Sequence, residues 1–316
     1  MRPKPVALPR PRRAEVAATI VAEPAISLEQ QLKTMFIRRE SLSLELGQLD
    51  AEIERFGLES LCGLTDDTQD VETYDGTLGV TRAFVDQHES PIGQLQWLAD
   101  LFSRFSDPNN SPGDVADVRW GSGGLFANNL FITAGHCFDK DGGGWQRPTR
   151  NGVTIEPEEI ARLMKVNFNF QVNGATGQTR PGNSFPVEEL LEFRKGNLDY
   201  AIVRLGRNES GQLPGEFFGA LKLSARDLVA NGEMLCLIQH PSGLPKRIEA
   251  GPMLQNVAGQ ISYDSLDTEG GSSGAPILSL AGEIVGVHTN GGCSRFSGSN
   301  FGVAIGAIRE ASSIIN

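Results

Sequence analysis

A run of eleven residues, from Asp267 to Ile277, constrains this chain more than any other stretch of its sequence. It reads Asp-Thr-Glu-Gly-Gly-Ser-Ser-Gly-Ala-Pro-Ile, so two serines stand between glycines directly before an apolar segment. Glycine permits positive φ and close approach of the backbone to a ligand, so the amides of Gly271 and Ser273 can converge on one point. The run predicts a turn that presents Ser273 as a nucleophile, with those two amides as an oxyanion hole. Taken alone it is only moderately specific, because Gly/Ser clusters before strands are more often plain turns.

Two further segments supply the groups that a reactive serine needs. Residues 130–137 form an apolar stretch that ends in Thr-Ala-Gly-His-Cys and carries His136, one of four histidines. Residues 198–205, Leu-Asp-Tyr-Ala-Ile-Val-Arg-Leu, place Asp199 at the start of another apolar stretch. A serine hydroxyl needs an imidazole to accept its proton, and the imidazole needs a carboxylate to fix its tautomer. We therefore predict a catalytic triad of His136, Asp199 and Ser273.

The three motifs, in the chain order His, Asp, Ser, resemble those of the chymotrypsin/trypsin-like serine proteases. Thr-Ala-Gly-His-Cys is similar to the histidine motif of that family, Leu-Asp-Tyr-Ala to its aspartate motif and Gly-Ser-Ser-Gly-Ala-Pro to its serine motif. The resemblance covers residues 74–316. It implies an all-β fold of two packed antiparallel β-barrels and a serine endopeptidase that acts on protein or peptide through an acyl-enzyme, without a cofactor. An α/β-hydrolase is disfavoured, because Ala275 breaks its Gly-x-Ser-x-Gly motif and no aspartate follows Ser273.

Two substrate-binding positions are similar to those of the glutamyl endopeptidases, bacterial members of this family. Thr268 stands five residues before Ser273, and His288 lies on the following strand. The resemblance implies a preference for an acidic P1 residue, Glu over Asp, because a hydroxyl and an imidazole can both donate to a carboxylate. Asp267 is a competing signal, since it has the offset at which trypsin-type enzymes keep the acid that binds Lys or Arg. Ser272 replaces the aspartate that activates trypsin-like zymogens, so we expect the oxyanion loop to form without cleavage.

The N-terminal quarter of the chain lies outside the resemblance. Residues 1–26 are rich in Pro and Arg, which predicts a disordered arm. Apolar residues recur every three or four positions through residues 28–56 and predict an amphipathic helix. That helix is suited to coiled-coil self-association, to a protein partner or to packing on the body of the protein. Residues 27–72 are interpreted as the helix and a linker, a propeptide or docking segment, and residues 73–316 as the protease domain.

Short strand patterns separated by Gly-rich turns run through the protease part. Residues 98–116 are expected as an insertion with a short helix. We expect strands at residues 91–97, 118–126, 130–133, 166–172, 201–205, 234–239 and 257–263, a hairpin over 277–288 and a terminal helix over 304–311.

Composition narrows the classes of function. The net charge of −11 argues against a nucleic-acid binder, whose affinity comes largely from Lys and Arg. No apolar run is long enough to cross a membrane, and no His/Cys pair has the spacing of zinc ligands. The four cysteines, Cys62, Cys137, Cys236 and Cys293, are too few and too scattered for a disulfide framework, which favours a reduced, cytoplasmic location. The resemblance implies a buried thiol at Cys137, because the side chain after the catalytic histidine points into the barrel in that family. The alternative function is a protease-fold binding module with an idle triad, recruited through residues 28–56.

Overall fold

The computed structural model describes residues 61–142, 144–294 and 297–315. These residues belong to one compact unit, residues 51–316. The predicted arm over residues 1–26 and the predicted helix over residues 28–56 lie outside the described residues. Within the described ranges, no helix has the length and apolar character needed to span a bilayer.

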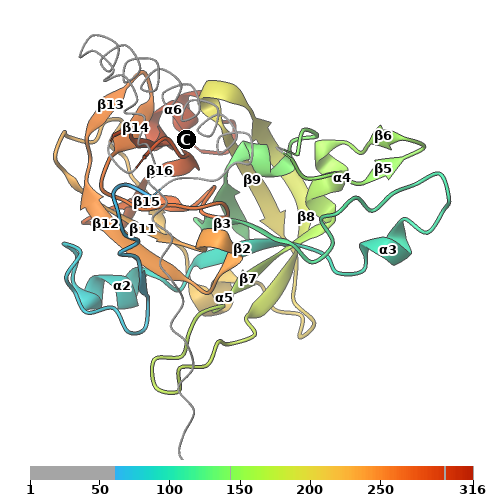
Figure 1. Cartoon of the computed structure of the whole chain (residues 1–316), viewed down its shortest axis with the longest axis horizontal. Helices are drawn as coiled ribbons and strands as arrows, with labels where there is room; N and C mark the ends of the chain where they lie inside the picture. Colours follow the sequence, from blue (N-terminus) through green and yellow to red (C-terminus); the bar gives the residue numbers. More distant parts are fainter. Residues whose placement is uncertain (1–60, 143, 295–296, 316) are drawn as a thin grey trace, which may run out of the picture. The chain divides into compact units, whose positions relative to one another are not determined.

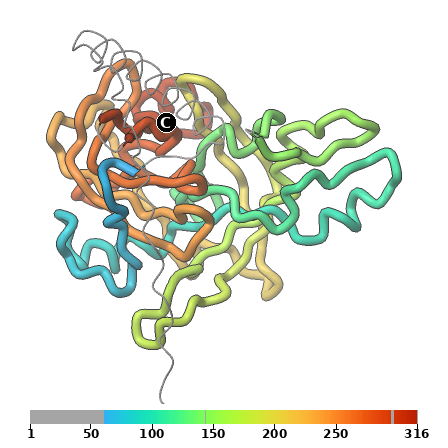
Figure 2. The backbone as a smooth tube through the Cα atoms, viewed as in Figure 1, coloured from blue at the N-terminus to red at the C-terminus, as the bar shows by residue number. Residues whose placement is uncertain are grey.

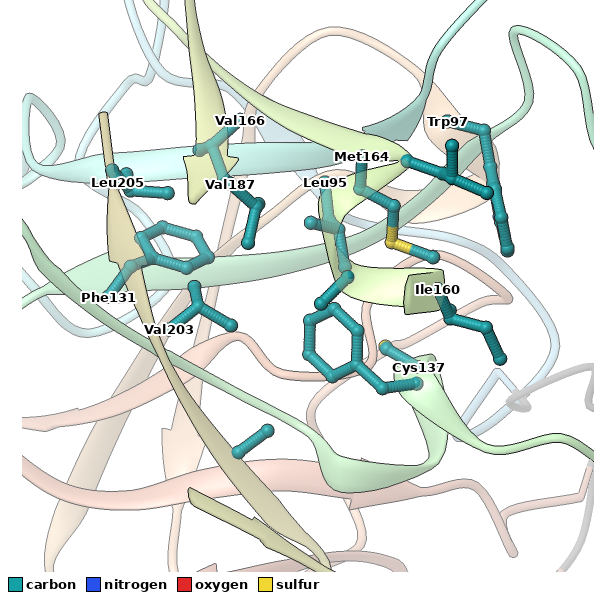
Figure 3. Close-up of a cluster of buried hydrophobic side chains, with 14 of the residues drawn as sticks. Leu95, Trp97, Phe131, Cys137, Ile160, Met164, Val166, Val187, Val203 and Leu205 are labelled. Atoms are coloured by element: carbon teal, nitrogen blue, oxygen red, sulfur yellow. The ribbon is translucent and has the colours of Figure 1, made fainter. Parts of the chain in front are cut away.

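Six antiparallel strands close into a barrel (Figure 1). Around the barrel they follow the order β2 (Ile92–Trp97), β3 (Arg119–Leu125), β4 (Leu130–Thr133), β9 (Tyr200–Leu205), β8 (Asn183–Arg194) and β7 (Met164–Phe168). Apolar side chains from these strands fill the interior, among them Leu95, Phe131, Met164, Val166 and Val203 (Figure 3). Burying each such side chain contributes about 1.5–3 kcal/mol, so the strands are held by their inward faces.

Nine strands form a second sheet, which curls but does not close into a barrel. Its main path runs through β1 (Gln69–Asp70), β12 (Arg247–Pro252), β11 (Met234–Gln239), β15 (Pro276–Ser279), β16 (Glu283–Asn290), β17 (Asn300–Ala304), β14 (Gln260–Tyr263) and β13 (Gln255–Val257), and β10 (Lys222–Leu223) pairs with β16. The β10–β16 pair is parallel and the other pairs are antiparallel. The predicted all-β class with two barrel-like halves is confirmed, with an open second half.

The barrel and the curled sheet share a hydrophobic core. Ile132 and Ile202 of the barrel are fully buried in one cluster with Ile238 and Val287 of the sheet. This shared core fixes the ends of β4 and β9 relative to the start of β15. The loops that follow β4, precede β9 and precede β15 therefore meet at the junction between the two halves.

Short helices and turns connect the strands, and their bounds are as follows: α2 (Arg82–His88), α3 (Leu101–Arg104), η1 (Gly135–Phe138), α4 (Pro157–Arg162), η2 (Gly196–Leu198), α5 (Gly215–Phe218), η3 (Pro241–Gly243) and α6 (Ile305–Ala311), with a small hairpin of β5 (Thr149–Arg150) and β6 (Val153–Thr154). The predicted terminal helix is confirmed as α6. The predicted insertion contains α3, and an isolated bridge from Ser111 to Thr149 holds it beside the β5–β6 loop (Figure 2).

Two predicted strands have different limits, for reasons of backbone conformation. The strand expected over residues 166–172 ends at Phe168, because Asn169 has φ +58°. The strand expected over residues 257–263 is a hairpin, since Ala258 and Gly259 have φ +52° and +79° and form its turn. Positive φ is uncommon for alanine, so Ala258 by itself does not indicate a turn.

Residues 61–72, expected as part of a linker, pack on the protease body. β1 pairs with β12, and Val71 is buried at 1% exposure. Cys62 forms a disulfide with Cys293, with Cα atoms 4.9 Å apart. This disulfide corrects the expectation drawn from the scattered cysteines, because folding brings together residues 231 positions apart in the sequence. Cys137 and Cys236 are buried thiols.

Candidate active site

His136 and Asp199 contact each other at the open ends of β4 and β9. The His136 Nδ1 lies 2.6 Å from Asp199 Oδ2, and the His136 main-chain N–H donates to Asp199 Oδ1 at 2.7 Å. The Asp199 side chain is only 8% exposed, whereas the imidazole is 39% exposed. A buried carboxylate that takes both hydrogen bonds holds the ring in one orientation, with Nδ1–H as the donor.

The turn that carries Ser273 is pressed against the turn that carries His136. The Ser122 N–H on β3 donates to the Ser273 carbonyl at 2.8 Å. Gly274 has φ +91°, and a Cβ at this position would lie 2.7 Å from the main-chain nitrogen of Ala134, two residues before His136. Only glycine allows this approach. The structure thus brings the predicted nucleophile to the strand end that holds the predicted base.

Gly271 has the conformation that an oxyanion loop requires. Its φ is +101°, and an added Cβ would meet the His240 carbonyl at 2.7 Å. The Gly271 carbonyl accepts from the Ser122 hydroxyl at 2.8 Å, which fixes the orientation of the peptide. Among the described residues, the Gly271 N–H has no hydrogen-bond acceptor. A fixed donor of this kind can stabilise charge that develops on a substrate oxygen.

The turn before the nucleophile closes on itself. The Ser272 N–H donates to the Glu269 carbonyl at 2.9 Å, and the Ser272 hydroxyl accepts from the Glu269 N–H at 3.1 Å. Ser272 is fully buried. These two hydrogen bonds between Ser272 and Glu269 hold the turn in its closed conformation.

His288, the candidate P1-binding residue, lies on β16 beside the serine turn. The Gly274 N–H donates to the His288 carbonyl at 2.7 Å, and the His288 N–H donates to Ala275 at 2.9 Å. The imidazole is fully buried, and its Nδ1 contacts the hydroxyl of Tyr263. Thr268 is also fully buried, with a hydroxyl that has no hydrogen-bond partner in the described part of the chain.

Asp267, the competing signal for a basic P1 residue, faces the N-terminal segment. Its carboxylate accepts from the main-chain N–H of Cys62 at 2.6 Å and of Asp67 at 3.2 Å, and the residue is 2% exposed. Burial raises the pKa of Asp267 to about 6 and that of its neighbour Glu249 to about 9. The carboxylate is therefore engaged by backbone donors and does not line an open pocket for Lys or Arg.

Sequence reasoning missed Arg147, which secures the turn of the predicted base. Arg147 is 5% exposed, and its guanidinium lies 4.1 Å from the ring centre of Trp120 and 5.4 Å from that of Trp97. It donates to the carbonyls of Asp139 at 2.9 Å and His136 at 3.5 Å. Burial lowers its pKa to about 10. No local signal identifies it, because an arginine in a polar loop usually indicates an exposed side chain.

Comparison with known proteins identifies the family. Residues 121–287 match the trypsin-like peptidase domain, and the chain belongs to this family. It is 29% identical to uncharacterized protein y4fB of Sinorhizobium fredii over 231 residues, which cover 65% of this chain and 32% of that protein. It is 25% identical to a glutamyl endopeptidase of Staphylococcus epidermidis over 166 residues, which cover 47% of this chain and 56% of the relative. The chain thus spans about a third of the first relative and just over half of the second.

A solved structure described as a Glu endopeptidase in complex with MPD aligns with 79% of this chain and 96% of its own, with a TM-score of 0.49 and 16% sequence identity.

Proposed function

We propose that this protein is a serine endopeptidase that cleaves peptide bonds through an acyl-enzyme. The observation that carries the proposal is the 2.6 Å contact between His136 Nδ1 and the buried carboxylate of Asp199, next to the turn that carries Ser273. Membership of the trypsin-like peptidase family supports the same conclusion.

In this mechanism Asp199 holds His136 with its proton on Nδ1, so Nε2 accepts the proton of Ser273 Oγ. The serine oxygen then attacks the carbonyl carbon of the scissile bond. The main-chain N–H groups of Gly271 and Ser273 stabilise the oxyanion, and the imidazolium gives its proton to the leaving amine. A water molecule, activated by the same imidazole, hydrolyses the acyl-enzyme.

The substrates that we propose carry Glu at P1. His288 supports this preference, since its imidazole can donate to a carboxylate and its backbone pairs with the serine turn. The contact between the Tyr263 hydroxyl and Nδ1 orients the ring. The engagement of Asp267 by two main-chain N–H groups counts against a preference for Lys or Arg.

We also propose that the enzyme works in an oxidising compartment. The disulfide between Cys62 and Cys293 supports this location, because disulfides persist in oxidising surroundings and are rare in the cytosol. This proposal replaces the cytoplasmic location that cysteine usage favoured at the level of sequence.

Cleavage of a peptide library by the full-length protein tests the substrate preference. We expect cleavage after Glu, with a loss of about tenfold or more in kcat/KM for Glu substrates in His288→Ala and in Tyr263→Phe, because a buried hydrogen-bonding group is removed. Tyr74→Phe is the matched control, since its buried hydroxyl contacts the Val80 carbonyl outside the site. Cleavage mainly after Arg, Leu or Phe would contradict the pocket assignment.

A further inference from the structure

Three carboxylates converge beside the loop that leads to the nucleophile. Asp67, Glu249 and Asp267 each offer one oxygen, and these atoms all lie within 4.8 Å of one another. They come from the N-terminal segment, from β12 and from the loop before the serine turn. Glu249 is fully buried, Asp267 is 2% exposed and Asp67 is exposed. The group thus has two enclosed carboxylates and one that faces solvent.

Two oxygen atoms at this place are buried and lack a hydrogen-bond partner among the described residues. One is Oε2 of Glu249, which belongs to the converging group, and the other is Oε1 of Gln239 on β11. Glu249 is paired with Leu237, which lies two residues before Gln239 on β11. The side chains of Glu249 and Gln239 therefore lie on the same face of the sheet. The Gln239 carboxamide donates through Nε2 to the main-chain carbonyl of Asp267 at 2.7 Å, so this side chain contacts the loop that carries Asp267. Oxygen atoms buried in this way need a positively charged or donating partner.

The described ion pairs do not provide that partner. Across residues 61–142, 144–294 and 297–315, no Lys or Arg forms a salt bridge with the three carboxylates. Arg247 leaves the same face of β12, but its guanidinium donates to the Thr68 carbonyl. The three carboxylates are thus not joined to a side-chain cation by an ion pair among the described residues.

We propose that Asp67, Glu249 and Asp267, together with the carboxamide oxygen of Gln239, bind a calcium ion. Calcium takes oxygen ligands from carboxylates, amide carbonyls and water in a flexible geometry, and this set contains only oxygen. The exposed side of Asp67 gives the ion a path from solvent. The bound ion joins residues 61–70 to the loop before Ser273 and stabilises the native state by mass action. This site is independent of the proposed proteolysis, because it uses neither the triad nor His288.

Calcium titration of the full-length protein by isothermal calorimetry, after treatment with a chelator, tests the proposal. We expect one bound Ca²⁺ per chain and a melting temperature that rises with calcium concentration. Glu249→Gln should lose about tenfold or more in calcium affinity, since a carboxylate ligand is replaced by a neutral carboxamide of nearly the same shape. Asp264→Asn is the matched control, because it removes the same charge from an exposed residue of the same loop. It should bind calcium as the wild type does.

A second variant covers the case in which Glu249→Gln does not fold. Asp67→Asn changes an exposed ligand and should weaken calcium binding while the protein remains folded. The proposal is overturned if the wild type binds no calcium at millimolar concentrations, or if folded Glu249→Gln or Asp67→Asn binds it as tightly as Asp264→Asn does.

Discussion

At the scale of single residues, His240 is a buried group that limits stability in acid. It is fully buried, stacks on Phe170 and donates from Nδ1 to the Leu244 carbonyl at 3.0 Å. Burial, and then the nearby Lys246, lowers its pKa to about 3.

We predict that acidification destabilises the protein through His240. The unfolded state binds a proton near the ordinary pKa of about 6.5, whereas the native state binds it only near pH 3, so this contribution to stability is complete above pH 6.5. Between pH 6.5 and 3 the free energy of unfolding should fall by about 1.4 kcal/mol per pH unit from this group. Urea denaturation at a series of pH values measures the slope. His240→Asn should show a smaller slope over this range, and an unchanged slope would contradict the assignment.

The triad candidates were predictable at this scale because each lies in a short motif. His136 follows a strand in Thr-Ala-Gly-His, and Asp199 precedes one in Leu-Asp-Tyr-Ala. Tyr263 and Arg147 were not predictable, because their contacts with His288 and His136 join residues 25 and 11 positions apart without a local pattern.

At the scale of elements, the N-terminal segment from residue 61 is part of the fold. β1 adds to the edge of β12, the disulfide joins Cys62 to the loop between β16 and β17, and the N–H groups of Cys62 and Asp67 satisfy Asp267. These contacts predict different outcomes for two truncations.

We predict that removal of residues 1–60 leaves the protease body folded and that removal of residues 1–72 destabilises it. The longer truncation deletes the disulfide, whose loss typically costs about 2–5 kcal/mol, and leaves Asp267 buried without its two donors. Thermal melting of both proteins, with the full-length chain as control, measures the difference. Equal melting temperatures for the two truncations would show that residues 61–72 do not stabilise the body.

At the same scale, the composition of β8 explains why this strand was not predicted. β2, β4 and β9 follow apolar patterns that indicate strands directly, and all three lie where they were expected. β8 contains Pro186 and acidic residues among leucines, and two register shifts interrupt its alternation. A strand without regular alternation gives no period-2 signal.

At the scale of the whole molecule, the candidate site lies at the junction of two sheets. The barrel supplies His136 and Asp199, and the curled sheet follows the turn that carries Ser273. Two packed barrels were expected because the three motifs resemble those of the trypsin-like proteases. The calcium site and the N-terminal disulfide were not predictable, because both join segments from opposite ends of the described chain.

Labelling of the full-length protein by a fluorophosphonate probe tests the central claim most directly, since the probe reacts with serines that an adjacent base activates. We expect the wild type to be labelled without prior cleavage, because the turn at Ser272 is closed by its own hydrogen bonds with Glu269. Ser273→Ala should not be labelled, and His136→Ala should be labelled far more slowly. Equal labelling of the wild type and Ser273→Ala would contradict the assignment of the nucleophile, and a wild type that is not labelled would indicate a binding module with an idle triad.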